Sequence, residues 1–261
     1  MADARDRYEH PLHRRSGPSI DDMAREIPAV TKVKHRTATI ELAGARVPSI
    51  MQLPEIDVPV PAVLLLHGYS SSKERLASSM GRALAARGIA SLAIDLPLHG
   101  NREDAMLSEA RTNPLGLLKH WQTALAEARA AIGWLAHHES VDPDHIAIAG
   151  YSLGSYVGLQ TAVVDKRVKC VIVAAGGDLP ATPWTGMLRM VSDPLASARS
   201  LKGRPLLMLH GTNDRTIRRE QAQRLYDAAG EPKELRWYEA GHVLPPAAGD
   251  DAATWVVEQF G

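Results

Sequence analysis

The 261-residue sequence contains a single cysteine, Cys170, and a single phenylalanine, Phe260. One cysteine excludes an intrachain disulfide and a cysteine-cluster metal site. Charge of either sign is not in excess, with 30 Lys and Arg against 30 Asp and Glu. This balance argues against a general nucleic-acid binder, which needs a basic excess. No apolar run reaches the roughly 18 residues of a membrane-spanning helix. With few aromatics, the core must be mainly aliphatic.

The N-terminal segment differs in composition from the rest. Its first ten residues lack the apolar stretch of a secretory signal, so we expect a cytoplasmic location. Residues 1–30 are polar and are interrupted by three prolines, which predicts an irregular arm. Residues 31–261 are expected to form one domain, because α/β folds of about 200–250 residues often are a single unit.

Apolar periodicity predicts an α/β fold. Two alternating segments, 37–42 and 46–53, flank Ala43-Gly44 and predict an antiparallel hairpin. Downstream, short apolar runs alternate with helical patterns, which predicts a mostly parallel central sheet with helices on both faces. The predicted strands are 62–66, 89–94, 145–149, 168–175, 206–209 and 234–238, and the predicted helices are 73–87, 117–137, 153–163, 219–228 and 250–259.

Two stretches, 99–116 and 177–200, break this alternation. Both follow predicted strands at the edge where open α/β sheets bind ligands. The apolar segment Trp184–Val191 predicts a small lid helix, in which Trp184 and Met187 would line a substrate pocket. The alternative is a helix that merely packs on the domain.

The segment Gly150-Tyr-Ser-Leu-Gly154 has the form G-x-S-x-G and lies between a predicted strand and a predicted helix. A sharp strand-to-helix turn of this kind lifts the serine hydroxyl above the sheet edge, and small flanking residues let the chains pass closely. The pattern therefore predicts that Ser152 is a nucleophile. The alternative is a serine that caps a glycine-rich helix terminus.

A nucleophilic serine needs a histidine base that a carboxylate orients. His242 follows the last predicted strand, and Asp214 follows the strand before it, so serine, acid and histidine come in the order of this architecture. Asp178, after the strand 168–175, is the second candidate for the acid. Asp193, before a proline in an irregular segment, is a weaker one.

Oxyanion stabilisation requires backbone donors near the nucleophile. We expect the N–H groups of Leu153 and Tyr69 to supply them, with His67 bracing the loop that carries Tyr69. The side chains of Tyr69 and Tyr151 are candidates for substrate binding. Arg102 can pair with a substrate carboxylate or, alternatively, brace its own loop beside Asp95 or Asp104.

Together these motifs resemble the α/β-hydrolase superfamily over about residues 60–261. The carriers are His67-Gly68, the Gly150–Gly154 turn, His210-Gly-Thr-Asn-Asp214 and Gly241-His242. The segment Asp95-Leu-Pro-Leu-His-Gly-Asn-Arg102 resembles D-x-P-x-H-G-x-R of dienelactone-hydrolase-like and prolyl-oligopeptidase-like esterases. Dienelactone hydrolases proper have a cysteine nucleophile where this chain has serine. Oligopeptidases usually carry a large N-terminal propeller, whereas about 60 residues precede the core here, so an oligopeptidase is the less favoured expectation.

The resemblance implies a serine carboxylesterase that needs no metal or cofactor. The predicted function is cleavage of carboxylic esters of small, largely uncharged substrates through a Ser-His-Asp triad and an acyl-enzyme. We expect a small-molecule ester as partner, with no nucleic acid or membrane, and the sequence leaves the oligomeric state open. The alternatives are a peptidase, amidase or thioesterase with the same triad, or a non-catalytic binding protein of the same fold.

Overall fold

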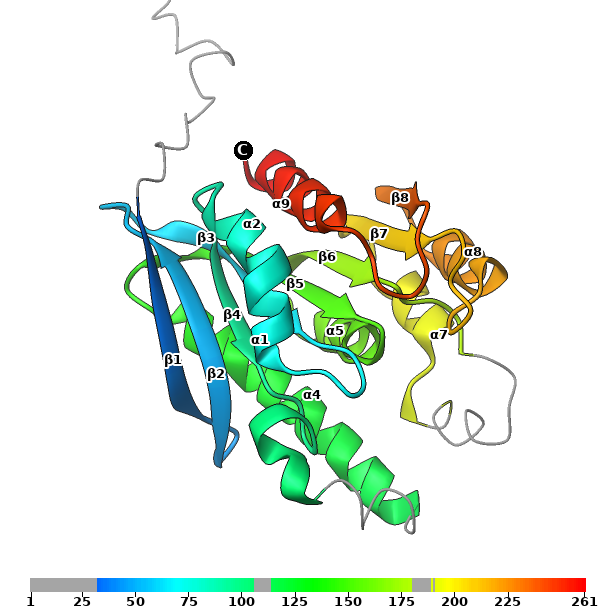
Figure 1. Cartoon of the computed structure of the whole chain (residues 1–261), viewed down its shortest axis with the longest axis horizontal. Helices are drawn as coiled ribbons and strands as arrows, with labels where there is room; N and C mark the ends of the chain where they lie inside the picture. The colour runs from blue at the N-terminus through cyan, green and yellow to red at the C-terminus, as the bar shows by residue number, and fades with distance from the viewer. Residues whose placement is uncertain (1–31, 106–113, 180–188, 190) are drawn as a thin grey trace, which may run out of the picture.

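The computed structural model describes residues 32–105, 114–179, 189 and 191–261. Within these ranges eight strands form one sheet in the order β1-β2-β4-β3-β5-β6-β7-β8 (Figure 1). The strands are β1 (Val33–Leu42), β2 (Ala45–Pro54), β3 (Val60–Leu66), β4 (Ala90–Ile94), β5 (Val141–Tyr151), β6 (Val168–Ala174), β7 (Leu206–Gly211) and β8 (Lys233–Tyr238). The main helices are α1 (Lys73–Leu76), α2 (Arg82–Ala85), α4 (Pro114–Ala136), α5 (Leu153–Val164), α7 (Pro194–Arg199), α8 (Arg219–Ala228) and α9 (Pro246–Phe260).

The predicted N-terminal hairpin is confirmed. β1 and β2 pair antiparallel and are joined at Ala43 and Gly44, both of which have positive φ angles. β2 also pairs antiparallel with β4, whereas every neighbouring pair from β4 to β8 is parallel. The predicted mostly parallel sheet with an antiparallel N-terminal hairpin is thus confirmed, and the carboxyl ends of its parallel strands meet at one edge.

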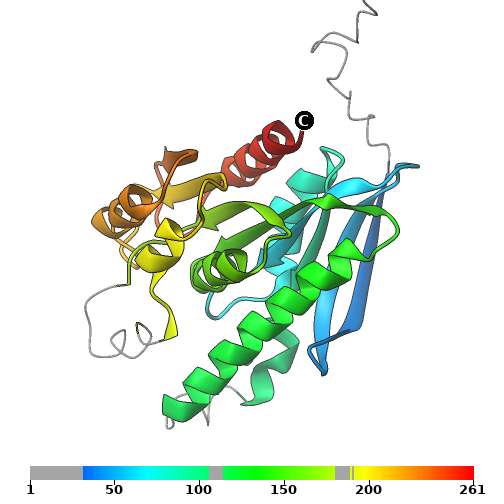
Figure 2. The same ribbon diagram turned by 180° about the vertical axis from the view of Figure 1, so that it is seen from behind.

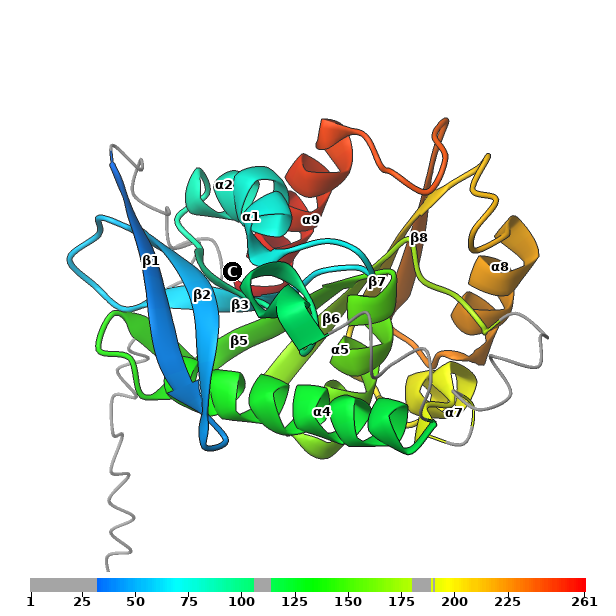
Figure 3. The same cartoon turned by 60° about the horizontal axis from the view of Figure 1, so that its bottom comes forward.

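Helices cover both faces of the sheet. α1, α2 and α9 pack on one face, and α4, α5, α7 and α8 on the other (Figures 2 and 3). Each face has its own aliphatic core: on β3, Val63 and Leu65 point to the first and Leu64 and Leu66 to the second. Strands buried on both faces read as continuous apolar runs, which is why the sequence pattern located them.

Some predicted elements differ in detail. The helix predicted over 73–87 is divided into α1 and α2 by a π-helical segment, Ala77–Gly81. The stretch predicted as irregular around Asp193 contains α7, whose first turn is capped by the Asp193 side chain accepting from the Ala196 amide (3.0 Å). The predicted lid helix lies outside the described residues except for Arg189 and Val191.

Of the 99–116 stretch, the short 3-10 helix Gly100–Ala105 and the start of α4 are described. None of the helices in the described part of the chain is both long enough and apolar enough to span a membrane.

Candidate active site

Ser152 lies on a sharp turn between β5 and α5. Its backbone has φ 49° and ψ −110°, a conformation that costs free energy for a residue with a side chain and is typical of functional sites. The glycines on either side permit the turn. A Cβ atom on Gly150 would overlap the carbonyl of Gly154, and one on Gly154 would overlap the carbonyl of Leu66. The predicted strand–turn–helix geometry is therefore present, and it fixes the serine at the sheet edge.

Three predicted residues form one hydrogen-bonded chain. The Nε2 atom of His242 lies 3.0 Å from the Ser152 hydroxyl oxygen, and its Nδ1 atom lies 2.7 Å from Oδ2 of Asp214. The three side chains follow the carboxyl ends of β5, β7 and β8, far apart in sequence. This is the arrangement that lets an imidazole accept a hydroxyl proton while a carboxylate orients the ring.

Asp214 is held rigidly behind the histidine. The residue is 5% exposed. Its Oδ1 atom accepts the backbone N–H groups of Thr216 (2.8 Å) and Ile217 (3.0 Å), which leaves Oδ2 for His242. The turn after β7 thus aims one carboxylate oxygen at the imidazole.

The other acid candidates are engaged elsewhere. The two carboxylate oxygens of Asp178 accept from Arg189 (2.8 Å) and Arg224 (2.9 Å). Asp193 caps α7. The geometry therefore brings Asp214, and neither alternative, to His242.

Tyr151 has a positioning contact that sequence reasoning missed. Its hydroxyl donates to the backbone carbonyl of His242 and accepts from the N–H of Leu244 (3.0 Å). Burial raises the pKa of this phenol, so it stays protonated and able to donate at neutral pH. Its ring also lies edge-on to the His242 ring, with centroids 6.0 Å apart. Tyr151, predicted to bind substrate, is hydrogen-bonded to the loop that carries the histidine.

The loop after β3 packs directly on the serine turn. A Cβ atom built on Gly68 would lie 3.3 Å from Cβ of Ser152, so only a glycine fits here without displacement. The next residue, Tyr69, has 67% of its surface exposed. Leu153 is the first residue of α5, where a backbone N–H has no acceptor within the helix. Leu153 directly follows Ser152, and Tyr69 directly follows the Gly68 that packs on it, so the oxyanion role of their amides stays a prediction.

His67 braces this loop, as expected. Its Nδ1–H donates to the carbonyl of Gly68 (2.8 Å), and its Nε2 accepts the N–H of Leu96 (3.0 Å). Burial lowers the pKa of His67 to about 4, so the ring is neutral at pH 7 and able to accept through Nε2. One imidazole therefore ties the loop after β3 to the loop after β4.

Arg102 also braces. Its guanidinium binds both carboxylate oxygens of the buried Glu127 (2.7 and 2.9 Å) and the carbonyl of Asp95 (3.1 Å). Its donors are thereby directed at α4 and at its own loop. The bracing partners predicted from the sequence were Asp95 and Asp104, and Glu127 was not among them.

Other predicted features lie outside this constellation. Trp184 and Met187, predicted to line the pocket, are not among the described residues. Cys170 is buried in β6, and burial raises the pKa of its thiol. In the described ranges, no group of three or more His, Cys, Asp or Glu side chains is arranged to hold a metal ion.

Comparison with known proteins places this geometry in a family. Residues 63–255 match the family model described as the alpha/beta hydrolase family. The chain is 27% identical to the esterase YjfP of Escherichia coli in an alignment 241 residues long, which covers 82% of this chain and 95% of that protein. It is 34% identical over 115 residues to the polyketide transferase ATR5 of Stachybotrys chlorohalonatus, a match that spans 44% of this chain and only 36% of the relative.

A solved structure shows the same fold. A candidate dienelactone hydrolase of Klebsiella pneumoniae superposes with a TM-score of 0.69 at 20% identity, covering 88% of this chain and 98% of that one. The family match spans most of the chain and contains Ser152, Asp214 and His242. The chain belongs to the alpha/beta hydrolase family.

Proposed function

We propose that this protein is a serine hydrolase that cleaves carboxylic esters of small, largely uncharged substrates through an acyl-enzyme intermediate. The observation that carries the proposal is the hydrogen-bonded chain from Ser152 through His242 to Asp214. The similarity to the esterase YjfP over nearly its whole length favours esters over other acyl compounds. The zero formal net charge fits substrates that carry little charge.

Acylation starts at the serine hydroxyl. Ser152 Oγ attacks the ester carbonyl carbon while Nε2 of His242 takes the hydroxyl proton. Asp214 holds the ring in the tautomer with the proton on Nδ1 and stabilises the imidazolium that forms. The tetrahedral intermediate collapses when His242 returns the proton to the leaving alcohol oxygen, which leaves the acyl group on Ser152.

Charge on the carbonyl oxygen is met by backbone donors. The N–H groups of Tyr69 and Leu153 serve as the oxyanion hole in this mechanism. Water then enters, loses a proton to His242 and attacks the acyl carbon, so that the acid leaves and the Ser152 hydroxyl is restored. All catalytic groups in this cycle come from the chain itself.

A cytoplasmic location and a single domain over residues 31–261 remain predictions.

The test is substitution of the nucleophile. Ser152→Ala is expected to lower kcat for p-nitrophenyl acetate by about 10⁵-fold, because the covalent step is lost. A fluorophosphonate probe should label the wild-type protein at Ser152 and leave the variant unlabelled. Near wild-type turnover by the variant would refute the assignment, and absence of labelling in the wild type would favour the non-catalytic alternative.

A substrate panel separates esters from the other acyl classes. Matched acetyl esters, thioesters and anilides share the acyl group and differ only in the leaving atom. We expect the highest kcat/KM for the esters. Faster anilide cleavage would instead support the peptidase or amidase alternative with the same three residues.

A further inference from the structure

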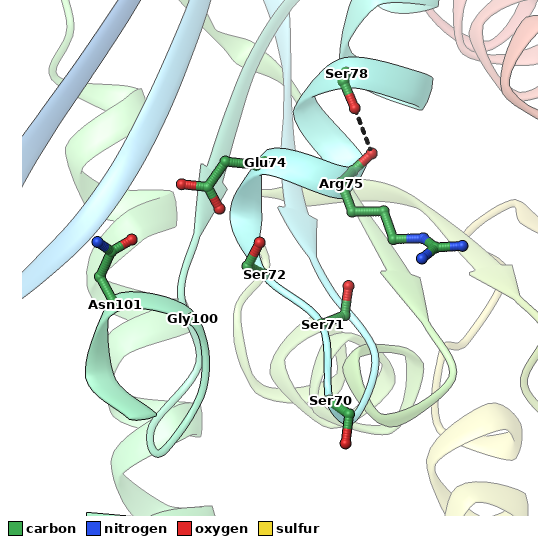
Figure 4. A pocket seen from close by; sticks show the side chains of 8 residues that line it. All are labelled: Ser70, Ser71, Ser72, Glu74, Arg75, Ser78, Gly100 and Asn101. Atoms are coloured by element: carbon green, nitrogen blue, oxygen red, sulfur yellow. Dashed lines mark hydrogen bonds between the residues drawn. The ribbon is translucent and has the colours of Figure 1, made fainter. Parts of the chain in front are cut away.

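A solvent-open cavity of about 720 Å³ adjoins the loop that carries Tyr69. Four serines of the loop and of the helical segment after it line this cavity together with Glu74, Arg75 and Asn101 (Figure 4). Its first lining residue, Ser70, directly follows Tyr69, and Gly68 packs on Ser152. The cavity therefore begins one residue from a proposed oxyanion donor, and the proposed mechanism gives it no role.

Two side chains of this cavity, Glu74 and Asn101, bind the same buried cation. The buried Lys73 ammonium binds the Glu74 carboxylate (2.6 Å), the Asp95 carboxylate (2.9 Å) and Oδ1 of Asn101 (2.6 Å). Lys73 is thus shared between two carboxylates, and the half-exposed Glu74 lies on the other side of the loop from Arg75 (Figure 4). On the Arg75 side a ligand meets two donors, the Ser71 hydroxyl and the Arg75 guanidinium.

Arg75 is the unmatched charge of the cavity. Its residue is exposed, and among the described residues no carboxylate lies within ion-pairing distance of its guanidinium. In Figure 4 the side chain extends over the loop, and the Ser71 hydroxyl points toward the same side. A fork of five N–H donors that lacks an internal partner matches a carboxylate or phosphate better than a neutral group.

The cavity adjoins the triad through the loop after β3. Gly68 packs on Ser152, and Ser70, two residues further along, lines the cavity together with Arg75. Burial raises the pKa of Tyr151, and the positive charge of Arg75 acts against this shift. The Tyr151 hydroxyl is hydrogen-bonded to the His242 carbonyl. A substrate that acylates Ser152 therefore lies beside the loop from which this cavity opens.

We propose that the Arg75 side of this cavity is a subsite for an anionic group of the ester substrate, remote from the scissile bond, which the Arg75 guanidinium binds with the neighbouring Ser71 hydroxyl. This inference rests on the proposed esterase function and refines its substrate class. A net charge of zero excludes a general steering field and does not exclude one local cation. The preferred substrate is then a neutral ester body with one acidic substituent.

Paired substrates test this subsite. The acyl series compares the mono-p-nitrophenyl esters of succinate, glutarate and adipate with p-nitrophenyl butanoate, pentanoate and hexanoate. The alcohol series compares para-carboxyphenyl with phenyl butanoate. For each pair, the ratio of kcat/KM for the carboxylated ester to that for the neutral ester is measured at low salt. Comparing this ratio between variants cancels the intrinsic reactivities of the two esters.

Arg75→Gln is expected to lower this ratio about five-fold in at least one series, mainly through KM, as for an exposed charge-assisted contact. Arg75→Glu should lower it further, and added salt should shrink the difference. The matched control is Arg82→Gln, an exposed arginine on α2 outside the cavity lining, which should keep the wild-type ratio.

The two proposals fail in different ways. If Arg75→Gln keeps the wild-type ratio in both series while the neutral esters are hydrolysed by the wild type and not by Ser152→Ala, the subsite is refuted and the esterase stands. An equal loss of the ratio in Arg82→Gln would also refute the subsite, because it would reflect general surface charge. If the wild type hydrolyses none of the esters, both proposals fail.

Discussion

Two buried carboxylates, Asp95 and Asp214, follow strands β4 and β7 and differ in the group that neutralises them. Both side chains are fully buried. Asp95 accepts the backbone N–H (2.9 Å) and the ammonium (2.9 Å) of Lys73 and the N–H of Asn101 (3.0 Å). Asp214 accepts two backbone N–H groups through one oxygen and faces His242 with the other.

The partners differ in whether their charge can change. Burial alone would lower the pKa of Lys73, but its hydrogen bonds to Glu74 and Asp95 outweigh burial and raise it. The Asp95 pair therefore keeps one charge state. In the proposed cycle His242 takes a proton from Ser152 and then returns it, so the Asp214 pair passes through two charge states. A partner that keeps its charge, such as Lys73, stabilises loops, whereas a partner that can take up and release a proton, such as histidine, supports proton transfer.

Substitution of Asp214 should have the largest effect, and this effect should be on kcat. Asp214→Asn is expected to lower kcat for p-nitrophenyl acetate by about 10⁴-fold, because an amide no longer stabilises the imidazolium or its tautomer. The amide oxygen can still accept the N–H groups of Thr216 and Ile217, so thermal unfolding should change little.

The matched control for that substitution is Asp178→Asn. Its carboxylate binds two arginines away from His242, and kcat should stay within a few-fold of wild type. A larger catalytic loss in Asp178→Asn than in Asp214→Asn would show that the wrong acid has been assigned.

Removing the counter-ion of Asp95 should instead lower the stability of the fold. Lys73→Met leaves a fully buried carboxylate without its counter-ion, which is expected to lower the free energy of unfolding by about 3–5 kcal/mol. Urea denaturation measures this value. The exposed Lys119, changed to Met in the same way, should shift it by about 0.5 kcal/mol or less. A stable Lys73→Met protein with a thousands-fold loss in kcat would break the comparison, because the pair would then serve catalysis directly.

The sequence alone predicted the contact between Asp214 and His242 and did not predict the contacts of Asp95 with Lys73 and Asn101. A strand, a tight turn and a helix are local patterns, so Gly150–Gly154 and the loops of Asp214 and His242 were recognisable from their neighbours. Lys73 instead looks like the polar start of a surface helix. Its burial depends on residues 22 and 28 positions away, which only the fold brings together.

The same reasoning explains two other differences. The partner of Arg102 is Glu127, 25 residues along the chain on α4, and no local pattern joins them. α7 had a local signal, because Asp193 precedes a proline at the first helical turn, a known capping arrangement. The surrounding stretch lacks apolar periodicity, so this signal alone does not predict a helix.

Each of the two carboxylates has a histidine beside it. The smallest predicted effect is on the pH dependence of stability and concerns His67, the histidine beside Asp95. Nε2 of His67 lies 3.9 Å from Oδ1 of Asp95, close enough for an ion pair if the ring were charged. It accepts the Leu96 N–H at 3.0 Å, which requires an unprotonated nitrogen, in agreement with a pKa lowered to about 4 by burial. This imidazole is neutral and structural.

The sign of the resulting pH dependence follows from the two states. The unfolded chain binds a proton at His67 below pH of about 6.5, whereas the folded protein binds one only below about 4. The stability that neutral His67 contributes is therefore complete above pH 6.5 and is lost as the pH falls toward 4. Between pH 7 and pH 5 this loss amounts to about 2 kcal/mol.

His67→Gln removes this titration while an amide oxygen can still accept the Leu96 N–H. The free energy of unfolding in urea, measured at pH 7 and pH 5, should therefore fall less in His67→Gln than in wild type, by about 2 kcal/mol. The exposed His137, changed to Gln in the same way, controls for loss of an imidazole. An unchanged pH dependence in His67→Gln would mean that the ring already carries a proton beside Asp95, and the two carboxylate–histidine pairs would then be alike.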